Sequence, residues 1–177
     1  ELASSYGNDG ESTWAFSGEA EIDKIKLFRH SAPESVNNEI TRRSNKDPGI
    51  TKLSTDLTTK NSLSEDVLQY QRDASAEGLE IVIFGHVPEN RVHVNIIPGS
   101  LSDYERGKKL VETWYRRALA SGGTVFREHG IGKVKRELFD HVTAAEVKNL
   151  IGANKRTLDP QGLFNPGNML IDSKTTD

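Results

Sequence analysis

Two apolar, β-branched runs on either side of a short polar segment form the clearest pattern in the chain. Residues 80–86 read Glu-Ile-Val-Ile-Phe-Gly-His, residues 91–98 read Arg-Val-His-Val-Asn-Ile-Ile-Pro, and Val-Pro-Glu-Asn lies between them. Two such runs with a short connection predict a β-hairpin. Because side chains alternate between the faces of a strand, one face of this hairpin is apolar and the other is mixed. The apolar face consists of Ile83, Gly85, Val87, Val92, Val94 and Ile96.

The mixed face carries His86, His93 and Asn95. If Glu89 and Asn90 form a two-residue loop, His86 lies directly opposite His93 on the paired strand. Opposed residues have Cβ atoms about 4.5–5.5 Å apart, which is close enough for both imidazoles to bind one metal ion. A turn shifted by one residue would make the two histidines diagonal neighbours that can still converge.

Helices are predicted over much of the remaining chain. One begins near Glu19, and capping boxes predict further helix starts at Ser31, Ser62, Ser102 and Thr143. Strands are predicted at 50–57 and 124–127, and the glycines at 78 and at 122–123 are expected to end helices. The predicted fold class is therefore α+β, a mainly antiparallel sheet with helices packed over it and the hairpin at 80–98 in its centre.

Composition narrows the choice of function. The 177 residues suffice for one domain, which we place at 13–177 after a flexible lead-in or cut linker at 1–12. A net charge of −3 with interspersed signs argues against nucleic-acid binding. The absence of cysteine leaves histidine and carboxylates as the strong metal ligands. No membrane span or signal peptide is predicted. The first residue is not methionine, so we expect the chain to be a fragment.

Chemistry is expected where the histidines gather. Glu128-His129-Gly130 follows the strand predicted at 124–127. His86, His93 and Glu128 form a three-ligand set that would leave metal positions open for a substrate. His129 would then be free to act as a base. The alternative interpretation is that both hairpin histidines are half-exposed strand residues and that Glu128-His129 is an ordinary turn.

Three motifs occur along the chain: Gly85-His86-x-x-x-Asn90-x-x-His93-x-Asn95, then Gly122-Gly123-Thr124-x-x-x-Glu128-His129-Gly130-Ile131-Gly132, then Lys155-x-x-Leu158-Asp159-Pro160-x-x-x-x-Asn165-Pro166-Gly167. Together they resemble the C-terminal substrate domain of the FAD-linked oxidases, the flavoenzymes that include D-lactate dehydrogenase, the glycolate oxidase flavin subunit and D-2-hydroxyglutarate dehydrogenase. Residues 27–34, Leu-Phe-Arg-His-Ser-Ala-Pro-Glu, also resemble the D-lactate dehydrogenase-like branch. The resemblance runs from about Thr13 to Leu170.

The resemblance implies roles for residues that match by position. His86, His93 and Glu128 match the ligands of a divalent ion such as zinc, manganese or iron. His129 matches a base that takes the hydroxyl proton of a 2-hydroxy acid while hydride leaves Cα for the flavin of FAD.

Four further residues match positions around the substrate or cofactor. Arg29 matches an arginine that pairs with the substrate carboxylate, and Lys52 matches a second cation in a looser alignment. Asn95 matches a polar residue beside the substrate, and Asn165 lies in a tail that returns toward the flavin. From the residues alone, the alternative is that Arg29 and Lys52 are solvated surface charges.

Two features depart from the family pattern. The hairpin tip is Val87-Pro88-Glu89-Asn90 where the family has a glycine-rich turn, and proline removes an amide donor and restricts φ, so a different turn is expected. Nothing in the chain supplies the glycine-rich pyrophosphate loop of an FAD-binding domain. We therefore expect that domain to be supplied in the same polypeptide or by a separate one.

The sequence thus predicts the substrate-binding C-terminal part of an FAD-dependent 2-hydroxy-acid dehydrogenase, similar to D-lactate dehydrogenase and inactive without its FAD-binding domain. The parent enzyme is expected in the cytosol or at a membrane surface, and its electron acceptor stays open. One alternative is a stand-alone metal- or ligand-binding module, or a subunit of a split enzyme. Another is a relative with a different substrate, such as an alkyl-glycerone-phosphate synthase.

Overall fold

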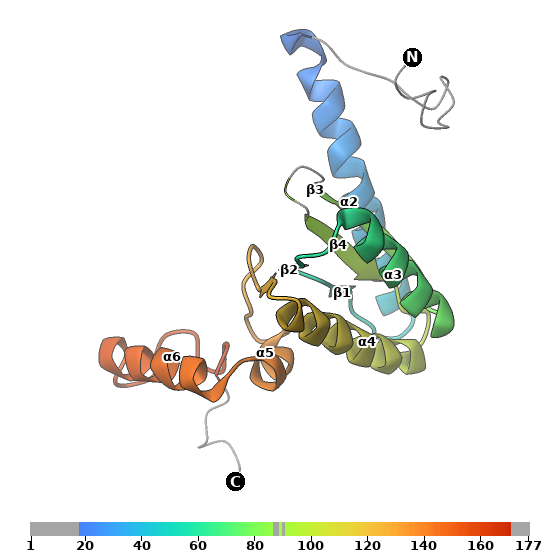
Figure 1. Cartoon of the computed structure of the whole chain (residues 1–177). Coiled ribbons are helices and arrows are strands. Elements are labelled where there is room, and N and C mark those ends of the chain that lie inside the picture. Colours follow the sequence, from blue (N-terminus) through green and yellow to red (C-terminus); the bar gives the residue numbers. More distant parts are fainter. Residues whose placement is uncertain (1–17, 87–88, 90, 171–177) are drawn as a thin grey trace.

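Helices and short antiparallel strands alternate along the chain in the computed structural model, which describes residues 18–86, 89 and 91–170 (Figure 1). The lead-in predicted at 1–12 lies outside these residues. The elements are η1 (Glu19–Glu21), α2 (Ile22–Ser44), β1 (Leu53–Ser54), β2 (Leu57–Thr58), α3 (Leu63–Ala76), β3 (Ile81–His86), β4 (Arg91–Ile96), α4 (Leu101–Ala120), β5 (Thr124–Val125), α5 (Arg136–Val142) and α6 (Ala145–Leu158). This arrangement confirms the α+β class.

The predicted hairpin of β3 and β4 supplies two of the three strands of the larger sheet, with β4 in the centre and β3 at an edge. The strand order is β1-β4-β3, and β2 pairs with β5 in a separate two-stranded sheet, with all pairs antiparallel. The register predicted for a two-residue loop at 89–90 is wrong, and the alternative of a turn shifted by one residue is confirmed. His86 pairs with Arg91, and His93 pairs with Phe84. His86 and His93 are therefore diagonal neighbours rather than a directly opposed pair.

The chemistry of proline explains why the tighter hairpin fails. A two-residue loop at 89–90 would place position 88 within the paired strands, where a proline has no N–H to donate to the ladder. The observed pairing ends at His86 and Arg91 and leaves four residues between the strands. Because the register moves by two residues, each side chain stays on its predicted face.

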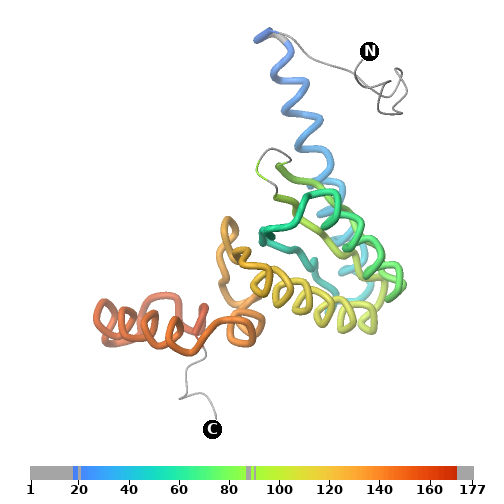
Figure 2. Tube along the Cα trace, in the orientation of Figure 1, coloured from blue at the N-terminus to red at the C-terminus, as the bar shows by residue number. Residues whose placement is uncertain are grey.

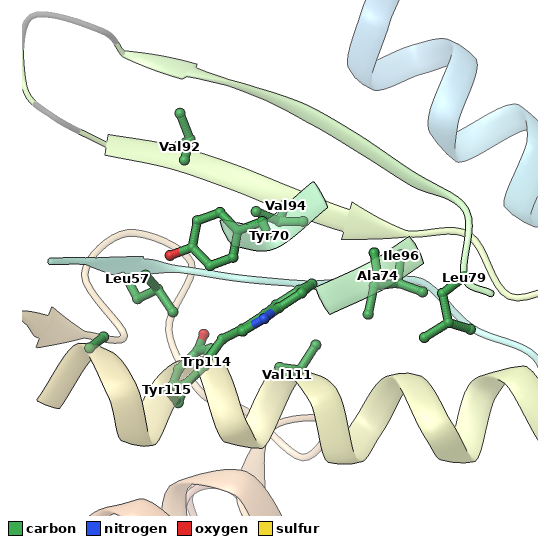
Figure 3. Close-up of a cluster of buried hydrophobic side chains, with 11 residues drawn as sticks. Leu57, Tyr70, Ala74, Leu79, Val92, Val94, Ile96, Val111, Trp114 and Tyr115 are labelled. Atoms are coloured by element: carbon green, nitrogen blue, oxygen red, sulfur yellow. The ribbon is translucent and has the colours of Figure 1, made fainter. Parts of the chain in front are cut away.

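The apolar face of the hairpin forms the main core together with α3 and α4. Val92, Val94 and Ile96 of β4 belong to one buried cluster with Trp114 and Tyr115 of α4 (Figure 3). Ile81 and Ile83 of β3 pack against the same cluster. The alternating apolar positions correctly predicted Ile83, Val92, Val94 and Ile96 on this face. Gly85 is exposed, and Val87, predicted on the same face, lies outside the described residues.

The opposite face of the sheet is shared between a small apolar cluster and polar groups. Val36 and Ile40 of α2 pack with Ile97, and Val82 and Phe84 lie against them. The C-terminal half of α2 therefore covers one part of this face. Beside it, the same face presents His93 and Asn95, which positions the candidate site.

The helix predicted to restart at Ser31 does not exist as a separate element, because α2 is continuous through Pro33. Ser31 Oγ donates to the Phe28 carbonyl at 2.6 Å, a bond within the helix rather than a cap. Ser62 does cap α3 in a full capping box with Glu65, as predicted. Gly78 follows that helix with a positive φ of 62°, which glycine tolerates.

Two other predicted helix starts are wrong. The side chain of Ser100, not Ser102, accepts from the Asp103 amide and caps α4. Ala144 precedes α6 without any side-chain cap, so the capping box predicted at Thr143 does not form. The short helix α5 was not predicted. Its Phe139 packs against Phe126, with the two ring centroids 5.7 Å apart.

The strand predicted at 50–57 divides into β1 and β2, which belong to different sheets. Thr55 and Asp56 form the link, and the Thr55 amide still donates to the Val94 carbonyl at 3.0 Å. The strand predicted at 124–127 is shorter, ending at Val125. The chain trace in Figure 2 shows α6 lying apart from the sheet. None of the helices in the described ranges combines the length and apolar character needed to cross a membrane.

Candidate metal and substrate site

A cavity of about 920 Å³ opens beside the mixed face of the hairpin. Its walls come from α2, β1, the hairpin, α4, the loop before α5 and α5 itself. All of the predicted site residues except Asn165 line it: Arg29, Lys52, His86, His93, Asn95, Glu128 and His129. Residues separated by up to 100 positions in the chain therefore share one cavity.

His93 is the most firmly held of the histidines in this cavity. Its side chain is 9% exposed, and its Nδ1 lies 3.1 Å from the Thr55 carbonyl. A proton on Nδ1 would donate to that carbonyl and leave Nε2 with a free lone pair. Nε2 lies 3.4 Å from Glu128 Oε2. A histidine held in this way is suited to ligate a metal.

Glu128 and His129 complete a compact cluster with His93. Glu128 Oε2 lies 3.7 Å from His129 Nε2, and the rings of His93 and His129 meet edge to face at 5.0 Å. One ligand atom from each of the three residues lies within 4.8 Å of the others. The side chain of His129 is 57% exposed, so its ring remains open to the cavity.

This donor set fits a divalent metal. Imidazole nitrogens with one carboxylate are ligands typical of zinc, manganese and iron sites that keep positions open. The other carboxylate oxygen of Glu128, Oε1, forms an ion pair with Arg91 Nη1 at 2.6 Å. Arg91 lies opposite His86 in the hairpin, where the sequence had predicted His93.

The structure thus brings together two of the three predicted ligands, His93 and Glu128, with the predicted base His129. His86 lines the same cavity on β3, one diagonal step from His93. Asn95 is buried, and its Nδ2 lies 3.4 Å from the Val82 carbonyl and from the His93 carbonyl.

The two basic residues predicted to bind the substrate carboxylate both line the cavity. Arg29 is exposed on α2 and lines the cavity. Lys52 also lines it, and its Nζ donates to Asn37 Oδ1 at 2.8 Å. Arg29 and Lys52 can therefore meet the carboxylate of an acid that occupies the cavity, although Lys52 has a neutral partner already.

Asn165 is the predicted site residue that does not line the cavity. It is exposed in the tail and has a positive φ of 47°. The Lys155-to-Asn165 motif has a structural role in this tail. Asp159 accepts from the Leu163 and Phe164 amides at 2.9 and 3.0 Å, and Lys155 pairs with Asp159. The motif therefore fastens the tail to the end of α6.

Sequence reasoning missed Asp56, which contacts both residues of the Glu128-His129 turn. Its Oδ2 accepts from the Glu128 amide and the His129 amide, each at 2.9 Å. Burial by itself would raise the pKa of Asp56, but the two backbone hydrogen bonds, with the charges of Lys135 and His129, hold the pKa below 3.8. No local pattern marks a residue whose partners lie more than 70 positions away.

Lys135 was missed for the same reason. It lines the cavity at the start of α5, and burial lowers its pKa. The charge of Asp56 opposes that shift, and the charge of Lys52 adds to it. Lys135 is thus a further basic residue that an anion in the cavity could meet.

Comparisons with known proteins show the family of the chain. The family model described as "FAD linked oxidases, C-terminal domain" matches residues 4–169. A probable mitochondrial D-lactate dehydrogenase of Danio rerio is 32% identical over 131 residues, which is 72% of this chain and 26% of that protein. A D-2-hydroxyglutarate dehydrogenase of Stutzerimonas stutzeri is 32% identical over 92 residues, 50% of this chain and 20% of that protein.

A mitochondrial cytochrome-type D-lactate dehydrogenase of Saccharomyces cerevisiae is 31% identical over 123 residues, which is 68% of this chain and 21% of that protein. The chain thus spans about a quarter or less of the length of these relatives. The family match covers nearly the whole chain and includes all three motifs. The chain belongs to the FAD-linked oxidases, an oxidoreductase family, through their C-terminal domain.

Proposed function

We propose that this chain is the substrate-binding part of an FAD-dependent 2-hydroxy-acid dehydrogenase with D-lactate-like specificity. The observation that carries the proposal is the convergence of His93, Glu128 and His129 on a cavity that also contains Arg29 and Lys52. Metal ligands, a histidine open to the cavity and basic residues are the groups that a hydroxyl beside a carboxylate requires.

Burial distinguishes the proposed metal ligands from the proposed base. His93 and Glu128 bind the divalent ion, with His86 from the paired strand as the third ligand. His129 is the most exposed of the clustered residues, so we assign it the role of base that takes the hydroxyl proton. Arg29 and Lys52 bind the carboxylate, and Asn95 orients the substrate. The metal, when bound, would polarise the hydroxyl oxygen and so ease loss of its proton.

The redox step belongs to FAD, which would accept hydride from Cα of the substrate. We propose that FAD is bound mainly by a domain in the same polypeptide or in a separate one, and that Asn165 lies near it. The electron acceptor stays open, and the cytosolic or membrane-surface location stays a prediction.

Metal binding by the purified chain is the first test. Titration with Co²⁺, followed by visible absorption, should give one site per chain in the wild type. His93→Ala and Glu128→Gln should each weaken it by at least tenfold, because each removes a ligand. Glu112→Gln is a suitable control, since Glu112 lines the same cavity but pairs with Arg116 and His141.

The third ligand is decided by comparing His86→Ala with His129→Ala. The proposal expects loss of Co²⁺ affinity in the first variant and near-normal affinity in the second. The reverse result would make His129 the third ligand and would remove it as the base. Failure of the wild-type chain to bind any divalent metal would refute the metal assignments.

A stand-alone binding module without redox function is the alternative. Mixing the chain with the flavin-binding portion of a related enzyme and adding D-lactate distinguishes the enzyme from the binding module. Reduction of the flavin, seen as bleaching of its visible absorption, supports the enzyme. Metal binding without complex formation or flavin reduction would favour the module.

A further inference from the structure

A fully buried carboxylate, Asp56, lies behind the candidate site and does not reach the cavity. Asp56 lies in the link between β1 and β2, and the whole residue is 0% exposed. Burying a carboxylate is costly unless it is hydrogen-bonded or paired with a cation. Within the described ranges no ion pair to Asp56 is found, and both hydrogen bonds to its carboxylate come from backbone amides.

Both amides belong to the residues whose side chains meet at the site. Oδ2 accepts from the Glu128 amide and from the His129 amide at 2.9 Å each, and Oδ1 is buried without a partner among the described residues. One oxygen therefore orients two successive peptide units. The orientation of these peptide units sets the direction of the Cα–Cβ bonds of Glu128 and His129, and hence the direction of the two side chains.

The backbone of Asp56 is itself anchored on both sides. Its amide donates to the Tyr115 hydroxyl at 2.9 Å, and its carbonyl accepts from the Phe126 amide at 2.8 Å. Tyr115 is fully buried in the main core. The backbone that carries the carboxylate is thus tied both to the main core and to the chain just before the Glu128-His129 turn.

The neighbouring residue, Thr55, holds the third member of the cluster. Its carbonyl faces His93 Nδ1 at 3.1 Å, and its Oγ1 accepts from the Val94 amide at 2.9 Å. The Thr55-Asp56 link therefore contacts His93 through a carbonyl, and Glu128 and His129 through a carboxylate. Groups of this kind, behind the ligands, orient them and tune metal affinity.

We propose that Asp56 is a positioning residue for the metal centre, and that its carboxylate aligns Glu128 and His129 toward His93. This inference rests on the proposed function for the presence of the metal, but the alignment itself is a property of the chain without metal. The charge matters because an anionic acceptor binds amide donors more strongly than a neutral one does.

The test compares Asp56→Asn with Asp66→Asn. Asp66 is the matched control, because it is also a buried carboxylate held by hydrogen bonds, to Thr59 and Asn61, but it lies outside the candidate cavity. Asp56→Asn should raise the Co²⁺ dissociation constant about 10- to 100-fold and alter the visible spectrum of bound Co²⁺. Asp66→Asn should lower the urea midpoint and leave the Co²⁺ dissociation constant and the visible spectrum unchanged.

A second measurement needs no metal, and its first part needs no variant. In the wild-type chain without metal, hydrogen exchange observed by NMR should show the Glu128 and His129 amides protected, although they lie in a loop. Where Asp56→Asn folds, both amides should shift and exchange at least tenfold faster.

Two results would overturn the proposal: rapid exchange of both amides in the wild type, or an Asp56→Asn variant that loses stability but keeps the wild-type Co²⁺ affinity and spectrum. If the wild type binds no Co²⁺ but its two amides are protected through Asp56, the metal centre fails while the alignment by Asp56 stands. The two failures are therefore distinguishable.

Discussion

Asp73 is a single carboxylate that joins α3 to α4. Its Oδ2 accepts from Trp114 Nε1 at 2.8 Å and Arg117 Nη1 at 2.7 Å, and its Oδ1 accepts from Gln69 at 2.7 Å. Burial alone would raise the pKa of Asp73, but these donors, Arg117 first among them, lower it below 3.8. The charged form is therefore the one that stabilises the fold.

This shift predicts an acid-sensitive contribution to stability. A carboxyl group whose pKa is lower in the folded state stabilises the protein above its unfolded pKa, about 3.9, and this stabilisation is lost as the pH falls through the folded pKa. Asp73→Asn should cost about 1–3 kcal/mol near pH 7, and the difference from wild type should shrink below pH 4. Urea unfolding between pH 3 and 7 measures it. A pH-independent difference would contradict the assignment.

At the scale of the element, the structure shows which of two nearby serines caps the start of α4. Ser102 stands in a capping-box pattern with Glu105, yet Ser100 has the extended backbone and the hydrogen bond of an N-cap. Asp103 also accepts from the Gly99 amide at 3.0 Å, which closes this helix end. The competing pattern begins only two residues away, so the sequence alone cannot select between them.

The two serines therefore predict different mutational costs. Ser100→Ala should lower the free energy of unfolding by about 1 kcal/mol, because an amide of the first turn loses its acceptor. Ser102→Ala is the matched control and should change stability by less than about 0.5 kcal/mol, as an exposed position within a helix. Urea denaturation of both variants provides the measurement. Equal costs, or a larger cost at Ser102, would place the cap where the sequence pattern did.

At the scale of the whole molecule, α6 and its tail leave apolar side chains uncovered. Leu150 of α6 is 65% exposed, and Leu163 and Phe164 of the tail are each 68% exposed. Gly152 is the one residue of α6 that is buried within the described part of the chain. Exposed apolar side chains on a helix and on the tail fastened to its end can provide a surface that binds another domain. We expect the FAD-binding domain to cover it.

This expectation can be tested on the chain itself. Leu163→Ser with Phe164→Ser should leave the free energy of unfolding within about 0.5 kcal/mol of wild type. The double variant should bind less of the fluorescent dye ANS and associate more weakly with a flavin-binding portion. Leu68→Ser, at a 50% exposed position on α3, is the control and should leave that association unchanged. Unchanged association in the double variant would exclude this surface as the interface.

The sequence by itself determined the features that depend on neighbours along the chain. Alternation assigned each hairpin residue to its face, and a register shift of two residues cannot change that assignment. The Ser62 cap, the end of α3 at Gly78 and the family motifs are local in the same sense. The motifs alone also identify His93, Glu128 and His129 as candidate site residues, because each stands at a fixed position within a short run of the chain.

The tertiary structure decided which residues meet. Alternation does not select a cross-strand partner, so only the pairing itself places Arg91 opposite His86 and Phe84 opposite His93. Asp56 carries no signature, because its partners Glu128 and His129 lie on a loop more than 70 residues away. Contacts of this kind arise when separate elements pack around one core, and no short-range pattern of side chains encodes them.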